Sequence, residues 1–282
     1  MKVYIEKKHI LTHQSKHLLM KSYKLLISLA LAYLVTFFNT NLFSQSLDKS
    51  FSAHLASESE IIGLQKDSEG KLYILGDFKR IDNTFLDANY VNNLIRIDNQ
   101  GEYDTSFKLD ESLANRSFNS LQVYQDRIIL ISFTSSNGNG IDILNLDGSI
   151  NADFQLDSSI NSVYEVKYKE GNYYAVVVLS GSLVFVKLNS DGSLNSEFGT
   201  HAFGGSSGSE ITILADNKIL ISGSVNKYDD TDVGTIFRVN TDGSLDQTFN
   251  TGSATISDGD VIDVEVLQDE TILVSGYFNT FD

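Results

Sequence analysis

The chain has 282 residues and contains no cysteine, no proline and no tryptophan. Without cysteine it cannot form a disulfide framework, a thiolate zinc site, an iron–sulfur cluster or a thiol nucleophile. Histidine is scarce as well, because only His54 and His201 lie outside the first 45 residues. Neither occupies a repeated position, and we expect both to be surface or rim histidines. These residue types indicate no catalytic set.

Positive charge is also in short supply, with 21 Lys and Arg against 37 Asp and Glu. Six of the basic residues and one acidic residue lie in residues 1–45, so the remaining chain carries a net charge of −21. Nucleic-acid binding requires a basic surface that neutralises phosphates, and an anionic membrane surface repels a chain of this sign. We therefore expect no nucleic-acid partner and a solvated, acidic exterior.

The first 45 residues have the pattern of a secretory leader. Leu25–Phe38 is an apolar run that follows Lys21 and Lys24 and precedes small residues near position 45. This order is typical of a signal peptide, and the run is shorter than the roughly 20 residues of a transmembrane helix. We predict a leader at residues 1–45, with Met20 as an alternative start. The remaining protein is then secreted or on the cell surface, without membrane insertion.

One motif, clearest in Ile236–Phe249 (IFRVNTDGSLDQTF), occurs four times after the leader. Each copy has an apolar residue four positions before a glycine, Asn or Asp three positions before and three after it, and a phenylalanine six after it. The glycines and phenylalanines are Gly101 and Phe107, Gly148 and Phe154, Gly192 and Phe198, and Gly243 and Phe249. Asx and Gly favour a tight turn between strands, and the phenylalanine is expected to anchor the neighbouring repeat.

Successive motif glycines are 47, 44 and 51 residues apart. Before each turn lies a continuous apolar run, such as Lys218–Gly223 (KILISG), which is typical of a strand covered on both faces. An alternating strand precedes each run, clearest in Val261–Leu267. With the short strand that ends in phenylalanine, each unit has the four strands of a propeller blade. We predict an all-β protein, a β-propeller of about 45–50-residue blades.

These residues resemble the delta-60 repeat, also called the DUF5122 β-propeller repeat. ADNKILISGSV with FRVNTDGSLDQTF, and SEGKLYILGDF with LIRIDNQGEYDTSF, follow the pattern of that family. The resemblance extends over nearly all of the chain after the leader and is most specific in the fourth repeat. It implies a propeller, often part of a large secreted or surface protein with further modules.

The repeat domain is predicted at residues 46–282. Repeats 1 to 4 cover about 60–107, 117–154, 160–198 and 210–249, and a partial repeat 5 covers 260–282. We expect the Gly/Ser-rich stretch Gly204–Glu210 to be a flexible connection. Since repeat 5 stops inside a blade, either the sequence is a fragment or Leu47–Phe51, which matches the end of the motif, completes that blade. Such closure still leaves a strand edge unpaired, so we favour a truncated propeller.

Two acidic segments are candidate calcium sites. The turn NTDGSLD of repeat 4 has alternating oxygen side chains but lacks the bidentate glutamate of an EF-hand loop. The loop at 228–232 contains Asp229, Asp230 and Asp232. A hairpin turn and a solvated loop are the simpler interpretations, so we predict no cofactor and keep the three aspartates of the loop as calcium candidates.

The loops between the second and third strands differ in length. Repeat 1 inserts Lys79–Asn92 and repeat 4 inserts Asn226–Gly234, whereas repeat 3 has only Ser180–Ser182. Such loops open on one rim of a propeller, and insertions there often mark a binding face. Aromatic residues of the insertions are Phe85, Tyr90 and Tyr228. We predict that they stack against a ligand, with packing inside the loops as the alternative.

We therefore expect an exported binding or display module whose partner is an extracellular glycan or protein. A glycan-active propeller enzyme is the alternative from another class, and it requires a clustered acid/base pair with raised pKa near the propeller axis. A purely structural spacer in a longer adhesin-like chain is the third interpretation. Carboxylates are too abundant for the sequence to single out a catalytic pair.

Overall fold

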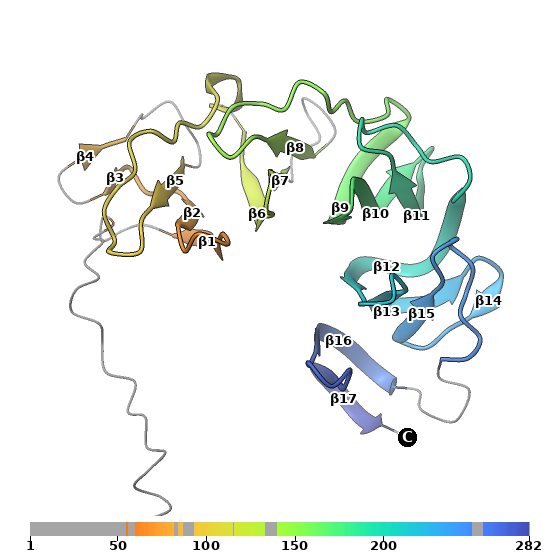
Figure 1. Cartoon of the computed structure of the whole chain (residues 1–282). Coiled ribbons are helices and arrows are strands. Elements are labelled where there is room, and N and C mark those ends of the chain that lie inside the picture. Colours follow the sequence, from red (N-terminus) through yellow and green to blue (C-terminus); the bar gives the residue numbers. More distant parts are fainter. Residues whose placement is uncertain are drawn as a thin grey trace, which may run out of the picture. The chain divides into compact units, whose positions relative to one another are not determined.

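The computed structural model describes residue 55 and residues 60–81, 84–86, 93–114, 116–132, 140–249 and 256–281. These parts consist of antiparallel β-strands joined by turns, and their one helical element is the 3-10 turn η1 (Glu111–Leu113). Figure 1 shows the strands following one another in groups along the chain. The prediction of an all-β protein is confirmed for the described residues.

Repeats 1 and 2 each form a three-stranded antiparallel sheet in chain order. Their strands are β1 (Ile61–Lys66), β2 (Leu72–Gly76) and β5 (Asn93–Ile97) in repeat 1, and β6 (Phe118–Val123), β7 (Ile128–Ser132) and β8 (Ile141–Leu144) in repeat 2. The second strand of each sheet pairs with both others and is almost entirely buried, which explains its continuous apolar sequence. Repeat 1 adds a separate hairpin of β3 (Arg80–Ile81) and β4 (Thr84–Phe85).

Repeats 3 and 4 share one strand, β12 (Thr200–Ile213), which pairs first with β11 and then with β13. The other strands are β9 (Ile160–Lys169), β10 (Asn172–Leu179), β11 (Ser182–Leu188), β13 (Ile219–Tyr228), β14 (Thr231–Asp232) and β15 (Ile236–Val239). Their order is β14-β13-β12-β11-β10-β9, with β15 also on β13. In repeat 5 the described strands are β16 (Ile256–Val266) and β17 (Ile272–Phe281), which form a hairpin.

The prediction of a flexible connection at Gly204–Glu210 is wrong, because this stretch belongs to β12. Gly205 has a φ of +117°, and a Cβ at this position would lie 2.3 Å from the carbonyl oxygen of Ser224. Glycine here allows β12 and β13 to approach closely at a register shift, so its role is steric fit and not flexibility.

All four motif turns have the same geometry. The glycines adopt φ values of 92°, 94°, 90° and 89°, which an L-residue with a side chain rarely adopts. The residue four before each glycine forms an isolated β-bridge with the residue two after it: Ile97 with Tyr103, Leu144 with Ile150, Leu188 with Leu194, and Val239 with Leu245. The predicted fourth strand of each unit is thus reduced to a single bridge.

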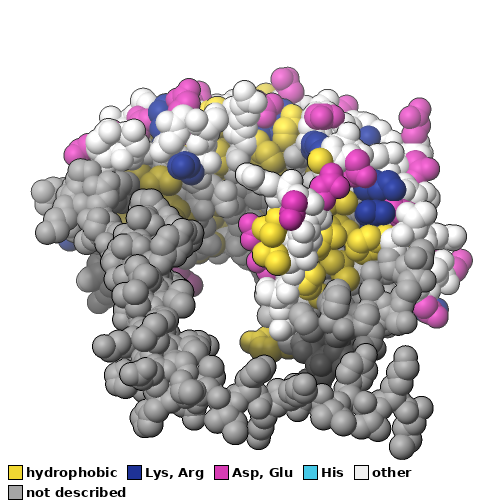
Figure 2. All heavy atoms as spheres, turned by 60° about the horizontal axis from the view of Figure 1, so that its bottom comes forward, with side chains coloured by type: hydrophobic (Ala, Val, Ile, Leu, Met, Phe, Trp, Pro, Cys, Tyr) yellow, Lys and Arg dark blue, Asp and Glu magenta, His cyan; other side chains and the backbone are white. Residues whose placement is uncertain are grey.

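Aspartates cap most of these turns. In repeats 2, 3 and 4 the residue before the glycine accepts hydrogen bonds from the backbone N–H and the hydroxyl of the serine two residues on, as Asp147 does from Ser149 at 3.0 and 2.6 Å. Repeat 1 has Gln100 at this position, and Asp98 accepts from the backbone instead. Figure 2 shows acidic side chains spread over the visible face. Part of the acidic composition therefore serves the turns.

Backbone hydrogen bonds link the segment after each of the first two motif phenylalanines to the turn of the next repeat. After Phe107, the N–H groups of Lys108 and Asp110 donate to the carbonyl oxygens of Asp147 and Gly148, each at 3.0 Å. The segment after Phe154 binds the turn of repeat 3 in the same way. A Cβ on Gly148 would lie 2.1 Å from the carbonyl oxygen of Lys108, so this glycine is required by contact as well as by φ.

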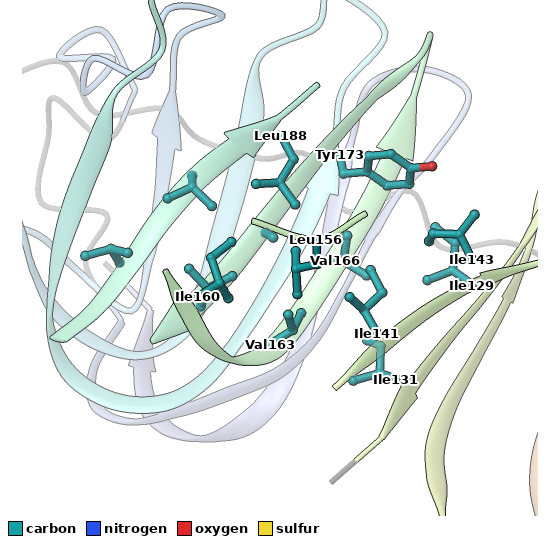
Figure 3. Close-up of a cluster of buried hydrophobic side chains, with 14 residues drawn as sticks. Ile129, Ile131, Ile141, Ile143, Leu156, Ile160, Val163, Val166, Tyr173 and Leu188 are labelled. Carbon is teal, nitrogen blue, oxygen red and sulfur yellow. The ribbon is translucent and has the colours of Figure 1, made fainter. Parts of the chain in front are cut away.

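The hydrophobic core lies mainly between consecutive repeats. Figure 3 shows one cluster, in which Ile129 and Ile143 of repeat 2 face Val166 and Tyr173 of repeat 3. Each motif phenylalanine lies in or against such a cluster, formed by its own repeat and the next one. Since burying one large apolar side chain contributes about 1.5–3 kcal/mol, packing between repeats stabilises the array strongly.

The first and last described repeats each have an apolar position that is uncovered. On the first strand of each repeat, Leu121, Val166, Ile211 and Val264 are at most 6% exposed, whereas the equivalent Leu64 of repeat 1 is 54% exposed. On the second strand, Leu273 of repeat 5 is 48% exposed, although its equivalents in the other repeats are buried. Leu64 and Leu273 are thus exposed at positions where the other repeats pack against a neighbouring repeat.

Candidate functional site

The hairpin β3–β4 presents the most exposed large aromatic side chain among the described residues. Phe85, on β4, is 80% exposed, whereas Ile81, on β3, and the preceding Phe78 are buried. The side chain of Asn93 donates a hydrogen bond of 2.8 Å to the carbonyl oxygen of Phe78 and fixes the base of the insertion. Phe85 is therefore an exposed ring on an anchored hairpin. Tyr90, the second predicted stacking residue, lies outside the described residues.

Tyr228 lies in the core, and its prediction as an exposed stacking residue is wrong. Strand β13 continues through the insertion to Tyr228, whose ring is 1% exposed and packs against Phe203, Phe237 and His201. Its hydroxyl donates a hydrogen bond of 2.6 Å to the carbonyl oxygen of Gly243, and burial raises its pKa. Tyr228 thus joins the inserted hairpin to the motif turn of repeat 4.

The acidic loop at 228–232 is built into the same cluster. Asp229 accepts from the backbone N–H of Ala202 at 2.9 Å and lies 3.0 Å from Nδ1 of His201, and Asp232 lies 3.6 Å from Nζ of Lys227. Within the described part of the chain, no group of three acidic or histidine side chains could hold a metal ion. The carboxylates of Asp229 and Asp232 have protein partners, and calcium binding by Asp229, Asp230 and Asp232 stays an untested prediction.

His201 and Asp229 have the geometry of two members of a hydrolase triad, and Gly204–Gly208 fits the letters G-x-S-x-G. However, the elbow of such enzymes is a strand-to-helix turn, whereas this stretch lies inside β12. Nε2 of His201, which would accept the proton of a nucleophile, lies 3.0 Å from the carbonyl oxygen of Phe198. The half-buried His201 is therefore a structural link between Asp229 and the carbonyl oxygen of Phe198.

A recurring β-bulge places one residue of each first strand at an equivalent position. Pairing with the second strand identifies these residues as Gly63, Ser120, Glu165, Glu210 and Asp263 in repeats 1 to 5. The bulge directly precedes the residue in four repeats and lies one residue further away in repeat 4. Bulges often re-aim side chains next to functional sites. Repeats 3, 4 and 5 thus carry carboxylates at one shared position, which we call the carboxylate row.

The carboxylate row faces the first strand of the following repeat. Glu210 accepts a hydrogen bond of 3.3 Å from the backbone N–H of Val264, on β16. A Cβ on Gly63, the equivalent residue of repeat 1, would lie 2.8 Å from Cβ of Leu121, on β6. The side chains of Glu165 and Glu210 are partly shielded from solvent, whereas Asp263 is exposed.

Burial raises the pKa of two members of the row. The pKa of Glu165 is raised by desolvation, although Nζ of Lys167 lies 3.0 Å from its carboxylate and opposes the shift. The pKa of Glu210 is raised by desolvation and further by the charges of Asp263 and Glu165, while Lys167 lowers it. Raised carboxylate pKa values are typical of groups that take part in acid/base chemistry. The alternative hypothesis, a glycan-active enzyme, requires a clustered pair of carboxylates with raised pKa values.

Sequence reasoning missed the carboxylate row, although a signal was present. The row residues lie eight or nine positions before the start of the apolar run on the second strand, as Glu210 does before Ile219. Aligning the first strands backwards from these runs would have placed Glu165, Glu210 and Asp263 together.

Comparisons with known proteins support the repeat assignment. A search of curated proteins found no match to the chain. Among the described residues, no helix is both long and apolar enough to span a membrane. Residues 214–249, which include β13, β15 and the motif turn of repeat 4, match the family model described as a domain of unknown function (DUF5122) beta-propeller.

Proposed function

We propose that this chain is an exported β-propeller binding module of an extracellular surface, whose blades of about 45–50 residues form part of a truncated propeller. Support comes from the DUF5122 beta-propeller match of repeat 4 and from the leader pattern of residues 1–45. Sequencing the N-terminus of the protein recovered from the medium of an expressing cell tests export. A mature start near residue 46 is expected, and an intact leader would contradict it.

The observation that carries the binding function is the exposed ring of Phe85. An aromatic side chain that is 80% exposed gains no burial energy in the free protein, yet its hairpin is held by the buried residues Phe78 and Ile81. A ring that is already positioned loses little conformational entropy on binding, and its flat apolar face suits a sugar ring or a pocket on a protein. The net negative charge of the chain favours a neutral glycan over an anionic one.

Binding to immobilised neutral oligosaccharides, measured for the wild type and Phe85→Ala, tests this function. Loss of the ring should weaken binding by about tenfold or more, since buried aromatic anchors contribute about 1–2 kcal/mol or more. Tyr277→Ala is the matched control, because Tyr277 is 79% exposed on another repeat and its loss should leave binding unchanged. Equal affinity of Phe85→Ala and the wild type would refute the assignment. A structural spacer predicts no binding by either protein.

The carboxylate row favours a second candidate, a glycan-active enzyme. Glu165 and Glu210 have raised pKa values and lie at equivalent positions of neighbouring repeats, and glycoside hydrolysis uses a pair of carboxyl groups. Reducing-sugar release from neutral polysaccharides by the wild type, Glu165→Gln and Glu210→Gln tests this candidate. The enzyme hypothesis predicts activity that each substitution lowers by at least about a hundredfold. Wild-type protein without activity would refute it and leave the binding module.

A further inference from the structure

A cavity of about 400 Å³ lies in repeat 2, between η1, β8 and the segment around Phe154. Its lining includes the charged pair Arg116 and Asp142, the polar Asn151, and the apolar Ile150, Phe154 and Leu156. A cavity of about 450 Å³ occupies the equivalent place in repeat 1, lined by Ile95 and Phe107. The two repeats thus share a cavity but differ in the side chains that line it.

Asp142 is exceptional among the residues at its repeat position. The equivalent residues, six before the motif glycine, are Ile95, Val186 and Phe237, which are all apolar and buried. Asp142 is 9% exposed, and desolvation raises its pKa even though Arg116 lowers it. A buried carboxylate at a position that suits an apolar side chain, paired with an Arg116 side chain that is 31% exposed, is rarely favourable for stability. Departures of this kind from the local pattern are expected at functional sites.

The ion pair of Arg116 and Asp142 leaves further hydrogen-bond donors and acceptors at the cavity. Nη1 of Arg116 donates to both carboxylate oxygens of Asp142, at 2.7 and 2.6 Å. The three N–H donors on Nε and Nη2 lie outside this contact, and each carboxylate oxygen can accept a second hydrogen bond. The pair can therefore offer donors and acceptors side by side, with no net charge.

We propose that this cavity binds one residue of a neutral glycan. Neighbouring hydroxyls of a sugar ring both donate and accept, so one hydroxyl can donate to Asp142 while the next accepts from Arg116. The apolar walls provided by Ile150, Phe154 and Leu156 suit the C–H face of the ring. The volume falls within the range of about 300–1,000 Å³ that is common for small-molecule sites. This site is distinct from Phe85 and does not depend on its role.

The test is ligand-observed NMR by saturation transfer, with glucose, galactose, mannose and N-acetylglucosamine as probes. We expect saturation transfer to at least one of the four sugars in the wild type. The double variant Asp142→Ile/Arg116→Met gives repeat 2 the apolar residue of repeat 1 and leaves no lone buried charge. Because this exchange should keep or raise stability, a weakening of binding by at least about tenfold reports on the site and not on unfolding.

Two controls separate the possible results. Lys71→Met/Glu69→Leu removes an exposed ion pair of the same charge and should leave the NMR signal unchanged. Repeating the comparison in a Phe85→Ala background removes any sugar contact with that ring, so failure of this site and failure of the proposed function are distinguishable. A wild type that receives no saturation transfer, or a double variant that binds as well as the wild type, would overturn the proposal. A lower melting temperature with retained binding would show that the pair is structural.

Discussion

Replacing Gly148 with alanine tests whether backbone contacts between repeats hold the array together. Gly148 has a φ of +94°, and a Cβ there would lie 2.1 Å from the carbonyl oxygen of Lys108. Gly70 is the matched control, because it has a φ of +88° but no atom within 4 Å of the position of its Cβ. The two substitutions therefore share the conformational strain and differ only in the contact between repeats.

The expected magnitudes follow from this difference. An alanine in the left-handed region costs about 1–2 kcal/mol, and this cost applies to both variants. At Gly148 the segment after Phe107 must also move away, which breaks the hydrogen bonds from Lys108 to Asp147 and from Asp110 to Gly148. Each such bond contributes about 0.5–1.5 kcal/mol. We expect Gly148→Ala to cost about 2–5 kcal/mol, which exceeds the cost of Gly70→Ala by about 1–3 kcal/mol.

Equilibrium unfolding in urea, followed by far-UV circular dichroism, measures both costs under identical conditions. Equal destabilisation by the two substitutions would refute the reasoning, because it would mean that the contact with Lys108 does not constrain the turn. A larger cost at Gly148 that is accompanied by a lower m-value would indicate instead that the repeats unfold separately.

Two further predictions concern packing and pH. Leu121→Ala should lower the free energy of unfolding by about 2–5 kcal/mol, whereas Leu64→Ala at the exposed equivalent position should lower it by less than about 1 kcal/mol. Urea unfolding measures both costs, and equal costs would contradict the packing between repeats. Hydrogen bonds from Ser149 lower the pKa of Asp147 in the folded protein. The stability that this carboxylate contributes is therefore present above its unfolded pKa near 4, and it is lost as the pH falls through the lower folded pKa. Asp147→Asn should therefore flatten the acid side of a stability–pH profile, and an unchanged profile would contradict the capping role.

The turns could be predicted from sequence because their determinants are local. The Asx residues and the glycine of each motif lie within a few residues of one another, and the structure shows the same turn four times. The contact of Gly148 with Lys108 could not be predicted in this way, because it joins two segments 40 residues apart. The positive φ of the turn already explains a glycine at this position, so nothing in the sequence pointed to a contact with another segment as a second reason for it.

Tyr228 shows where loop reasoning fails. The insertion in repeat 4 was expected to be a loop because it lengthens the connection between two predicted strands. Instead β13 continues to Tyr228, and the ring packs into a cluster with Phe203 and Phe237. Exposure depends on how β13 pairs with the shared strand β12, which local sequence does not specify. Phe85, on the short hairpin of repeat 1, is exposed as expected.

The recurring bulge on the first strand has a consequence for how such repeats can diversify. Because the bulge occurs with Ser120, Glu165 and Asp263 alike, the backbone at this position accepts side chains of different size and charge, except in repeat 1, where a Cβ on Gly63 would lie 2.8 Å from Cβ of Leu121. Selection can therefore change the chemistry between neighbouring repeats by one codon at a time, while strand pairing stays intact. Repeats that arise as identical copies by gene duplication could in this way acquire separate roles without passing through an unfolded intermediate.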